Sequence, residues 1–451
     1  MLHPQLPVPN LDSLPRYRIT ARLEPPSLSG QMQLTLPNGG DETLEDVVLR
    51  LYGNAETIYT GSQMWAGNVS VDGQATGTQE EVEGTALRIF LPEPLPPGEA
   101  ATLSLDFQTI VATENFRGYG IQQMAGGIGV FGSPFPLLAL RENDKWRVSA
   151  VPVVGDGVSS PVGLWDIFLE LPADVTLVST GEIVPTVEGT VHVVSGPARD
   201  VVLTTLPAGA AAIETQVAGV RLRYWPAPYV EMAGSQLPAS EAATIAAEAV
   251  EAFAAEFGPP PYTELDVVEA QVPIGGYEYP GLVLFDGEER ARASRNALEF
   301  LIPHEIAHQW FYALLGNDVT REPWIDEGLA TYASLRYLAH RHGAEAALAR
   351  RAAWEAEYAN VLAREPVGVN GVVYEYTNWI EYRGPTYYAS ALLFDDLRQR
   401  LGDAPFQEAI RRLLTRFAFR EATTQDVQAV FNEVATEEGV ELDAFWSYWL
   451  R

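Results

Sequence analysis

Residues 303–332 read PHEIAHQWFYALLGNDVTREPWIDEGLATY, and this stretch decides what kind of domain the second half of the chain forms. It contains two segments of helical character, which are separated by the short polar loop GNDVTREP. The first segment holds His304 and His308, with Glu305 directly after the first histidine, and the second segment holds Glu327. The pattern predicts two antiparallel helices that bring Glu327 alongside the histidines.

These side chains have the spacing of a catalytic zinc site. Residues i and i+4 lie on one face of a helix, so both imidazoles can point at one position about two ångströms from each ring nitrogen. Glu305 lies about 100° round the helix from His304, where a general base can accept a proton from water. Because two histidines do not complete such a site, we predict one Zn²⁺ held by His304, His308 and Glu327. An ordinary polar patch on a helix is the alternative, and the offset of Glu327 disfavours it.

Pro303 directly precedes the first histidine. It removes one backbone donor and crowds the carbonyl four residues back, so the helix either begins near Pro303 or is kinked just before the ligands. Both alternatives leave His304, Glu305 and His308 on helical geometry.

The charge and composition of the chain exclude several classes of function. Of its 451 residues, 60 are acidic and 29 basic, and the formal net charge of −31 opposes binding to nucleic acid or anionic membrane. There is no cysteine, which excludes disulfides, cysteine-ligated zinc and thiol catalysis. No signal peptide and no long apolar run is found, so we expect a soluble chain. A cytoplasmic location and export after loss of a leader both stay open, as does the oligomeric state.

The first half of the chain has the pattern of an antiparallel β domain. Short apolar segments alternate with Pro, Gly, Asp and Asn from about residue 15 to 215. We predict a β-rich domain over residues 1–215, with strands at 17–24, 32–37, 44–52, 86–92, 101–108, 164–172, 175–180 and 201–207.

The second half, residues 216–451, is predicted to be a mixed α/β unit that becomes helical towards the C-terminus. The Ala- and Glu-rich segment 238–258 has helical periodicity and ends at Gly258. Strand-like segments follow at 264–274 and 280–285. Further helix candidates lie at 298–316, 322–343, 345–363, 385–402 and 404–419.

The opening stretch closely resembles the HExxH-x18-E signature of the M1 family of zinc aminopeptidases, relatives of aminopeptidase N and leukotriene A4 hydrolase. GGYEYPGL, residues 275–282, resembles the family's GxMEN element. The resemblance implies that Glu278 binds the free α-amino group of the substrate, with Gly275, Gly276 and Tyr277 beside it in the substrate site. Tyr277 and Tyr279 stand where the family often has Met and Asn, which alters the shape of the subsite.

A third similarity concerns YYASALLFDDLRQRLGDAPF, which begins at Tyr387. It resembles the family's helix that carries a tyrosine whose hydroxyl hydrogen-bonds the oxyanion of the tetrahedral intermediate. Counting back from LRQRLG selects Tyr387 for this role. Ser390 stands where the family usually has Gly, so Tyr388 and Tyr382 stay open as alternatives for this role.

The resemblance also carries expectations about fold and function. It implies a saddle-like antiparallel β domain followed by a thermolysin-like zinc peptidase domain, without the large C-terminal helical domain of longer members and with a more open active site. We expect a zinc aminopeptidase that acts on peptides with a free N-terminus, and whose side-chain pocket includes an unassigned loop of the N-terminal domain. The alternatives are a thermolysin-like endopeptidase and a non-catalytic binding protein that retains the fold.

Overall fold

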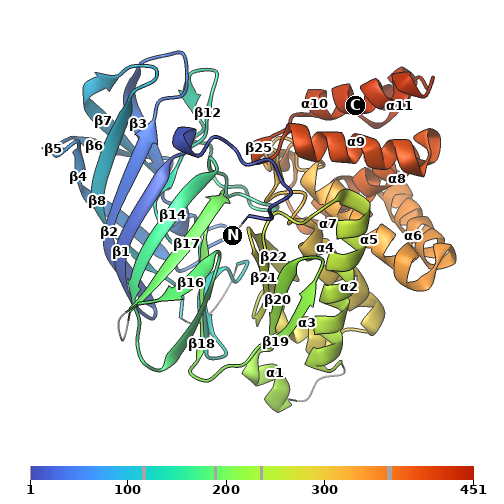
Figure 1. The fold of residues 1–451 in the computed structure, drawn as a ribbon, viewed down its shortest axis with the longest axis horizontal. Helices are drawn as coiled ribbons and strands as arrows, with labels where there is room; N and C mark the ends of the chain where they lie inside the picture. Colours follow the sequence, from blue (N-terminus) through green and yellow to red (C-terminus); the bar gives the residue numbers. More distant parts are fainter. Residues whose placement is uncertain (1, 114–117, 187–189, 234–236, 363–367, 451) are drawn as a thin grey trace.

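The structure, a computed structural model, describes residues 2–113, 118–186, 190–233, 237–362 and 368–450. A β-rich half and a helical half lie side by side, the first at the left of Figure 1 and the second at the right. Among the described residues, no helix has both the length and the apolar character that a membrane span requires.

The strands of the first half are β1 (Arg16–Glu24), β2 (Ser27–Pro37), β3 (Leu44–Arg50), β4 (Gln63–Val71), β5 (Gln74–Ala75), β6 (Thr78–Glu81), β7 (Ala86–Leu95), β8 (Ala100–Ile110), β9 (Gln122–Ala125), β10 (Ile128–Gly132), β11 (Leu137–Leu138), β12 (Arg141–Glu142), β13 (Lys145–Trp146), β14 (Gly163–Glu170), β15 (Val175–Ser179), β16 (Glu182–Pro185), β17 (Thr190–Ala198) and β18 (Val202–Pro207). The second half has strands β19 (Ile213–Val217), β20 (Val220–Trp225), β21 (Glu264–Ala270), β22 (Gly276–Tyr279), β23 (Leu282–Asp286), β24 (Leu315–Gly316) and β25 (Arg420–Glu421).

The helices are α1 (Pro228–Ala233), α2 (Ala239–Phe257), α3 (Gly287–Arg292), α4 (Arg295–Ala307), α5 (Asp326–His342), α6 (Ala344–Leu362), α7 (Trp379–Arg383), α8 (Ser390–Leu401), α9 (Asp403–Arg416), α10 (Thr424–Glu437) and α11 (Asp443–Trp449). The short 3₁₀ helices are η1 (Leu11–Ser13), η2 (Tyr52–Asn54) and η3 (Val373–Glu375), and a π-helical turn, η4 (Gly384–Ala389), leads into α8.

The β-rich half is built on an eight-stranded open sheet of order β16-β17-β14-β1-β2-β8-β4-β5. Its strands are antiparallel apart from β1 and β14, which run parallel. Strand β1 alternates exposed and buried residues, because successive side chains of a strand point to opposite faces. Two four-stranded sheets, β15-β18-β10-β9 and β11-β3-β7-β6, complete this half. The predicted β-rich half is thereby confirmed, and each predicted strand overlaps an observed one.

A five-stranded sheet of order β19-β20-β21-β23-β22 joins the two halves. Val267 and Val283 belong to the core of the helical half, whereas the adjacent Val268 and Leu284 belong to the core of the β-rich half. The parallel strands β21 and β23 are buried on both faces, as is characteristic of parallel sheets, whereas β20 alternates buried and half-buried residues. Strand β19 already contains residues 215 and 216, at which the sequence places the domain boundary, and that division stays a prediction.

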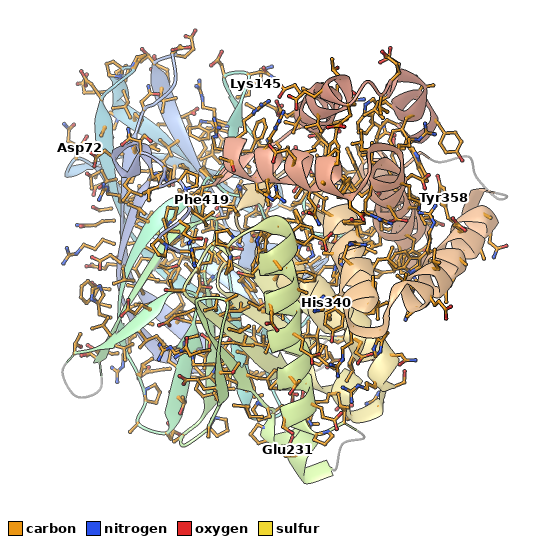
Figure 2. The ribbon with its side chains drawn as sticks, turned by 45° about the vertical axis from the view of Figure 1, so that its right-hand side comes forward. Asp72, Lys145, Glu231, His340, Tyr358 and Phe419 are labelled. Atoms are coloured by element: carbon orange, nitrogen blue, oxygen red, sulfur yellow. The ribbon has the colours of Figure 1, made fainter. Side chains whose placement is uncertain are left out.

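Helix α4 packs against α2 and α5 in the helical half. Figure 2 shows these helices beside the sheets, with His340 marking the end of α5 and Glu231 marking α1. The helix runs from Arg295 through Pro303, so the alternative in which it begins near the proline is wrong. Leu298 and Ile302, one turn apart and both buried, anchor the turns before the proline in the apolar core.

The helix also ends earlier than the sequence predicts. It closes at Ala307, with His308 as an αR cap, instead of continuing to Gly316. The chain leaves the helix because its backbone bonds elsewhere: β24 pairs in parallel with β25, and the amide of Phe419 donates to the carbonyl of Leu314. His304 and His308 nevertheless keep helical φ and ψ angles, which is what the site requires.

Candidate metal centre and active site

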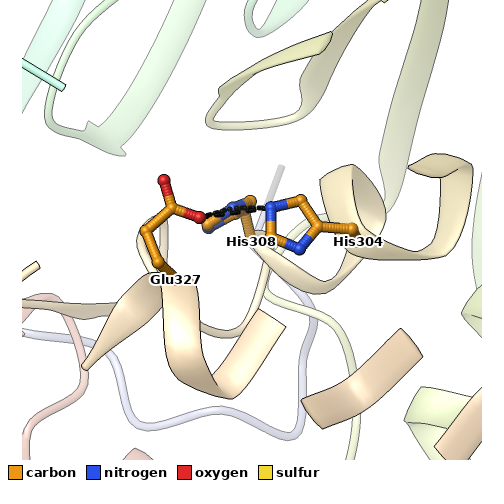
Figure 3. A group of neighbouring side chains, drawn as sticks. All are labelled: His304, His308 and Glu327. Atoms are coloured by element: carbon orange, nitrogen blue, oxygen red, sulfur yellow. Dashed lines mark hydrogen bonds and ion pairs between the residues drawn. The ribbon is translucent and has the colours of Figure 1, made fainter. Parts of the chain in front are cut away.

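His304, His308 and Glu327 bring three ligand atoms together (Figure 3). The Nε2 atoms of the two histidines lie 3.2 Å apart. Oε2 of Glu327 lies 3.2 Å from Nε2 of His304 and 3.6 Å from Nε2 of His308. Zinc bonds of about 2.0–2.1 Å in a tetrahedron separate neighbouring ligand atoms by about 3.3–3.4 Å. Oε2 of Glu327 is buried without a hydrogen-bond partner among the described residues. The three groups therefore fit a bound zinc ion.

Neighbouring groups hold the two imidazoles in place. Nδ1 of His308 lies 2.9 Å from the carbonyl oxygen of Phe311, and Nδ1 of His304 lies 3.3 Å from Oγ1 of Thr331. An Nδ1–H that donates outward leaves the Nε2 lone pair directed at the metal position. Thr331 lies one turn after Glu327 on α5, so this helix supplies both the third ligand and an orienting hydroxyl.

Burial and local charge set the protonation of the carboxylates here. Burial by itself raises the pKa of Glu327, but the two adjacent histidines outweigh it and hold that pKa well below its usual value. Burial raises the pKa of Glu305 to about 8, and only His308 among its main neighbours acts to lower it. A cation bound beside Glu305 favours the ionised carboxylate, because an opposite charge stabilises it.

Glu278 lies on β22, the edge strand of the five-stranded sheet, beside α4. One carboxylate oxygen each of Glu278 and Glu305 and a ring nitrogen of His308 all lie within 4.8 Å of one another. Burial raises the pKa of Glu278 well above its usual value, and the charge of Asp156 adds to this. An ammonium group placed at Glu278 favours its ionised form for the same electrostatic reason.

The two glycines before it have separate structural roles. A Cβ on Gly276 would lie 2.4 Å from Cδ of Glu305, so the absence of a side chain lets β22 approach that carboxylate. Gly275 has φ +106°, which favours glycine, and its amide donates to the carbonyl of Val272. Tyr277 is buried in the core of the β-rich half and also lines the cavity at the site.

The three candidate tyrosines have different surroundings. The hydroxyl of Tyr387 donates a 2.6 Å hydrogen bond to Oε1 of Glu327, and its ring centroid lies 5.6 Å from that of His304. Tyr388 stacks on Trp354 in the cavity wall, and Tyr382 is fully buried. Of the three, Tyr387 has its hydroxyl at the ligand cluster.

A cavity of about 360 Å³ contains the whole cluster. Its lining includes every predicted site residue except Gly275, and also the alternative candidate Tyr388. The sequence did not single out the other lining residues, namely Asp156, Pro273, Ile274, Phe300, Leu301, Trp379 and Arg383. Asp156 belongs to a loop of the N-terminal half that lines this cavity, and a role of this loop in the side-chain pocket stays a prediction. Asp156 lies between two glycines far from any catalytic motif, and no periodicity connects it with α4. Only the packing of the two halves reveals it.

Comparison with known proteins agrees with this site. Residues 245–449 match the Peptidase family M1 domain. Aminopeptidase M1-D of Oryza sativa subsp. japonica is 25% identical over 210 residues, covering 42% of this chain and 23% of the rice protein. Aminopeptidase 2 of Candida albicans is 24% identical over 247 residues, covering 51% and 25%. The chain thus spans about a quarter of the length of these relatives.

Solved structures match over nearly the whole chain. The M1 zinc metallopeptidase from Deinococcus radiodurans is 22% identical with a TM-score of 0.69, covering 95% of this chain and 92% of that one. A mutant of that enzyme with the substrate Tyr-Ser-Ala bound has a TM-score of 0.70 at 22% identity, covering 97% and 94%. These likenesses confirm the predicted fold class of a β-rich half and a helical peptidase half. Residues 245–449 thus carry the match to the Peptidase family M1 domain, and the chain as a whole has the fold of the M1 zinc metallopeptidases it resembles.

Proposed function

We propose that this protein is a zinc-dependent aminopeptidase that removes the N-terminal residue from peptides. The observation that carries the proposal is the position of Glu278, whose carboxylate lies within 4.8 Å of both the candidate base Glu305 and the candidate ligand His308. A carboxylate so close to the reacting centre can pair with the α-ammonium group, whose nitrogen is two bonds from the carbonyl carbon of the first peptide bond. Such a site selects the N-terminal end of a peptide.

One zinc ion is the proposed cofactor, held by His304, His308 and Glu327. The donor set of two imidazoles and one carboxylate is one that catalytic zinc sites use, with the fourth position left for water or substrate. Zinc supplies a Lewis acid there, which acidifies water and polarises a carbonyl oxygen.

The remaining side chains of the site divide the other tasks. Glu305 accepts a proton from the attacking water and delivers it to the departing amine. Glu278 receives the α-ammonium group. Burial raises the pKa of the nearby Asp156 well above its usual value, and the ammonium group favours the ionised form of this second carboxyl group as well. The hydroxyl of Tyr387 donates a hydrogen bond to the oxyanion that develops on the carbonyl oxygen. A donor held in this position lowers the activation barrier.

Two other functions are compatible with parts of this site. A thermolysin-like endopeptidase would use the same zinc ligands and base, but it has no use for a buried carboxylate aimed at the reacting centre. A non-catalytic binding protein that retains the fold would not need Glu305. The presence of Glu278, Glu305 and the three ligands in one cavity therefore favours the aminopeptidase.

The zinc-loaded protein can be tested on leucine p-nitroanilide and on an internally quenched peptide with an acetylated N-terminus. We expect hydrolysis of the anilide and at least about a hundredfold slower cleavage of the blocked peptide, since the α-ammonium pairing is lost. Glu278→Gln should raise KM for the anilide with zinc content unchanged. Rapid cleavage of the blocked peptide would establish the endopeptidase instead, and no cleavage of either by zinc-loaded protein would favour the binding protein.

A further inference from the structure

The cavity at the metal centre is strongly unbalanced in charge. Four carboxylates line it, those of Asp156, Glu278, Glu305 and Glu327. Arg383 is the only lysine or arginine among the described residues of the lining. A bound cation and a substrate ammonium group favour the ionised forms of these carboxyl groups, and the ionised carboxylates then repel an anionic part of the same substrate. A substrate that carries both charges therefore needs Arg383.

Arg383 lines the cavity from α7, an element that carries none of these four carboxylates. It closes α7 and lies one helical turn before Tyr387, with its guanidinium carbon 5.4 Å from the ring centroid of Tyr388. The charges that act most strongly on Glu278 are those of Asp156, His308, Glu305 and Glu327. The cavity is thus lined by four carboxyl groups and by one guanidinium group from a separate element, together with Tyr387.

The guanidinium group has hydrogen-bonding capacity left. Its Nη2 donates a 2.7 Å hydrogen bond to Oε1 of Glu357 on α6. Among the described residues, the guanidinium group makes no second hydrogen bond. The side chains of this pair are 48% and 43% exposed, and ion pairs that are so open to water contribute little free energy. Five N–H donors in a planar fork match a carboxylate in two parallel bonds. The ion pair with Glu357 therefore positions Arg383 and leaves other N–H donors of its guanidinium group available for a ligand.

We propose that Arg383 binds the C-terminal carboxylate of the substrate, which makes short peptides with a free C-terminus the preferred substrates. This inference rests on the proposed aminopeptidase function, with the α-ammonium group at Glu278. The cavity of about 360 Å³ lies near the lower end of the range of roughly 300–1,000 Å³ for small-molecule sites. A tripeptide spans at most about 10 Å, so both of its charged ends can be held in one such cavity.

Three substrates separate this inference from the proposed function. They are Leu-Ala-Ala with a free C-terminus, the same tripeptide as its C-terminal amide, and leucine p-nitroanilide, which has no carboxylate. Hydrolysis of the anilide by the zinc-loaded protein reports on the aminopeptidase function alone. The ratio of kcat/KM for the free tripeptide to that for its amide reports on recognition of the carboxylate.

We expect this ratio to be about 10 in the wild type, the effect of one charge-assisted bidentate pair, and to arise mainly in KM. Arg383→Ala should reduce the ratio to about 1, and Arg383→Glu should invert it. Arg383→Lys should retain part of it, because lysine keeps the charge but loses the fork. Arg341→Ala is the matched control, since Arg341 also forms an exposed ion pair, with Glu248, and does not line the cavity.

Anilide hydrolysis combined with a wild-type ratio near 1 would overturn the role of Arg383 and leave the aminopeptidase intact. A ratio that persists in Arg383→Ala and Arg383→Glu would do the same. Absence of anilide hydrolysis would overturn the proposed function itself.

Discussion

The hydroxyl of Tyr387 donates a 2.6 Å hydrogen bond to Oε1 of Glu327, while Oε2 of the same carboxylate faces both histidines. One glutamate thus connects the candidate oxyanion donor with the candidate metal ligands. The relationship places the phenol where it can move from the ligand to a developing oxyanion without a large displacement.

Tyr387→Phe therefore tests two effects of one hydroxyl. We expect kcat to fall about 10²- to 10³-fold, as when one oxyanion donor is removed. Zinc affinity should fall by about tenfold, because a group that hydrogen-bonds a metal ligand is lost. Steady-state kinetics at saturating zinc and competition with a chromogenic chelator measure the two separately. Tyr388→Phe is the control, and an equal loss of kcat in that variant would reassign the oxyanion role.

Gly276→Ala should displace the candidate base Glu305 and lower kcat, with little effect on the stability of the fold. The new Cβ would occupy the space of the Glu305 carboxylate, 2.4 Å from its Cδ, and that flexible side chain is what must move. We expect kcat to fall between about 10²- and 10⁴-fold, the range of general-base contributions. The midpoint of thermal unfolding should change little. Gly275→Ala is the contrasting variant, because its φ of +106° should cost about 1–3 kcal/mol of stability. A Gly276→Ala variant with normal kcat would contradict this packing.

Removal of the metal should abolish activity and lower stability together. Ligands that bind only the folded state stabilise it by about 4 kcal/mol when present at 1,000 times their dissociation constant. We expect o-phenanthroline to lower the thermal midpoint and stop hydrolysis, and added Zn²⁺ to restore both. In His304→Ala the chelator should have a much smaller effect on the midpoint. Full activity after verified removal of zinc would exclude the metal centre.

Asp200 should make the stability of the fold depend on pH. It is buried, accepts a 3.1 Å hydrogen bond from Tyr312, and its Oδ1 has no partner among the described residues. Burial raises its pKa from 3.8 to about 7. Below about pH 3 the carboxyl is protonated in both the folded and the unfolded chain, so it imposes no penalty. As pH rises towards 7 the unfolded chain ionises first, and stability is progressively lost.

Asp200→Asn removes this penalty and keeps an acceptor of similar shape. Relative to the wild type, its free energy of unfolding should increase by about 3 kcal/mol more at pH 8.5 than at pH 5. Urea unfolding of both proteins at the two pH values measures the difference. A difference that does not change with pH would show that Asp200 is ionised in the folded protein.

Much of this site could be predicted because its chemistry is local in the sequence. His304, Glu305 and His308 lie within two helical turns, so helical periodicity places them together. Glu327 lies on a second helix, and its offset in the motif indicated it as the third ligand. The strands of the β-rich half were also predictable, because alternating burial and turn residues are properties of short segments. The end of α4 was not, since the carbonyl of Leu314 bonds the amide of Phe419, about a hundred residues away.

The sequence by itself therefore determined the family resemblance, the fold class and the residues that can hold zinc. The tertiary structure decided which further side chains line the cavity beside them. Asp156 comes from a loop of the β-rich half and Arg383 from the end of α7, and neither belongs to a motif. Their positions depend on how the five-stranded sheet packs against both halves. That packing is a sum of many non-local contacts, which no short stretch of sequence encodes.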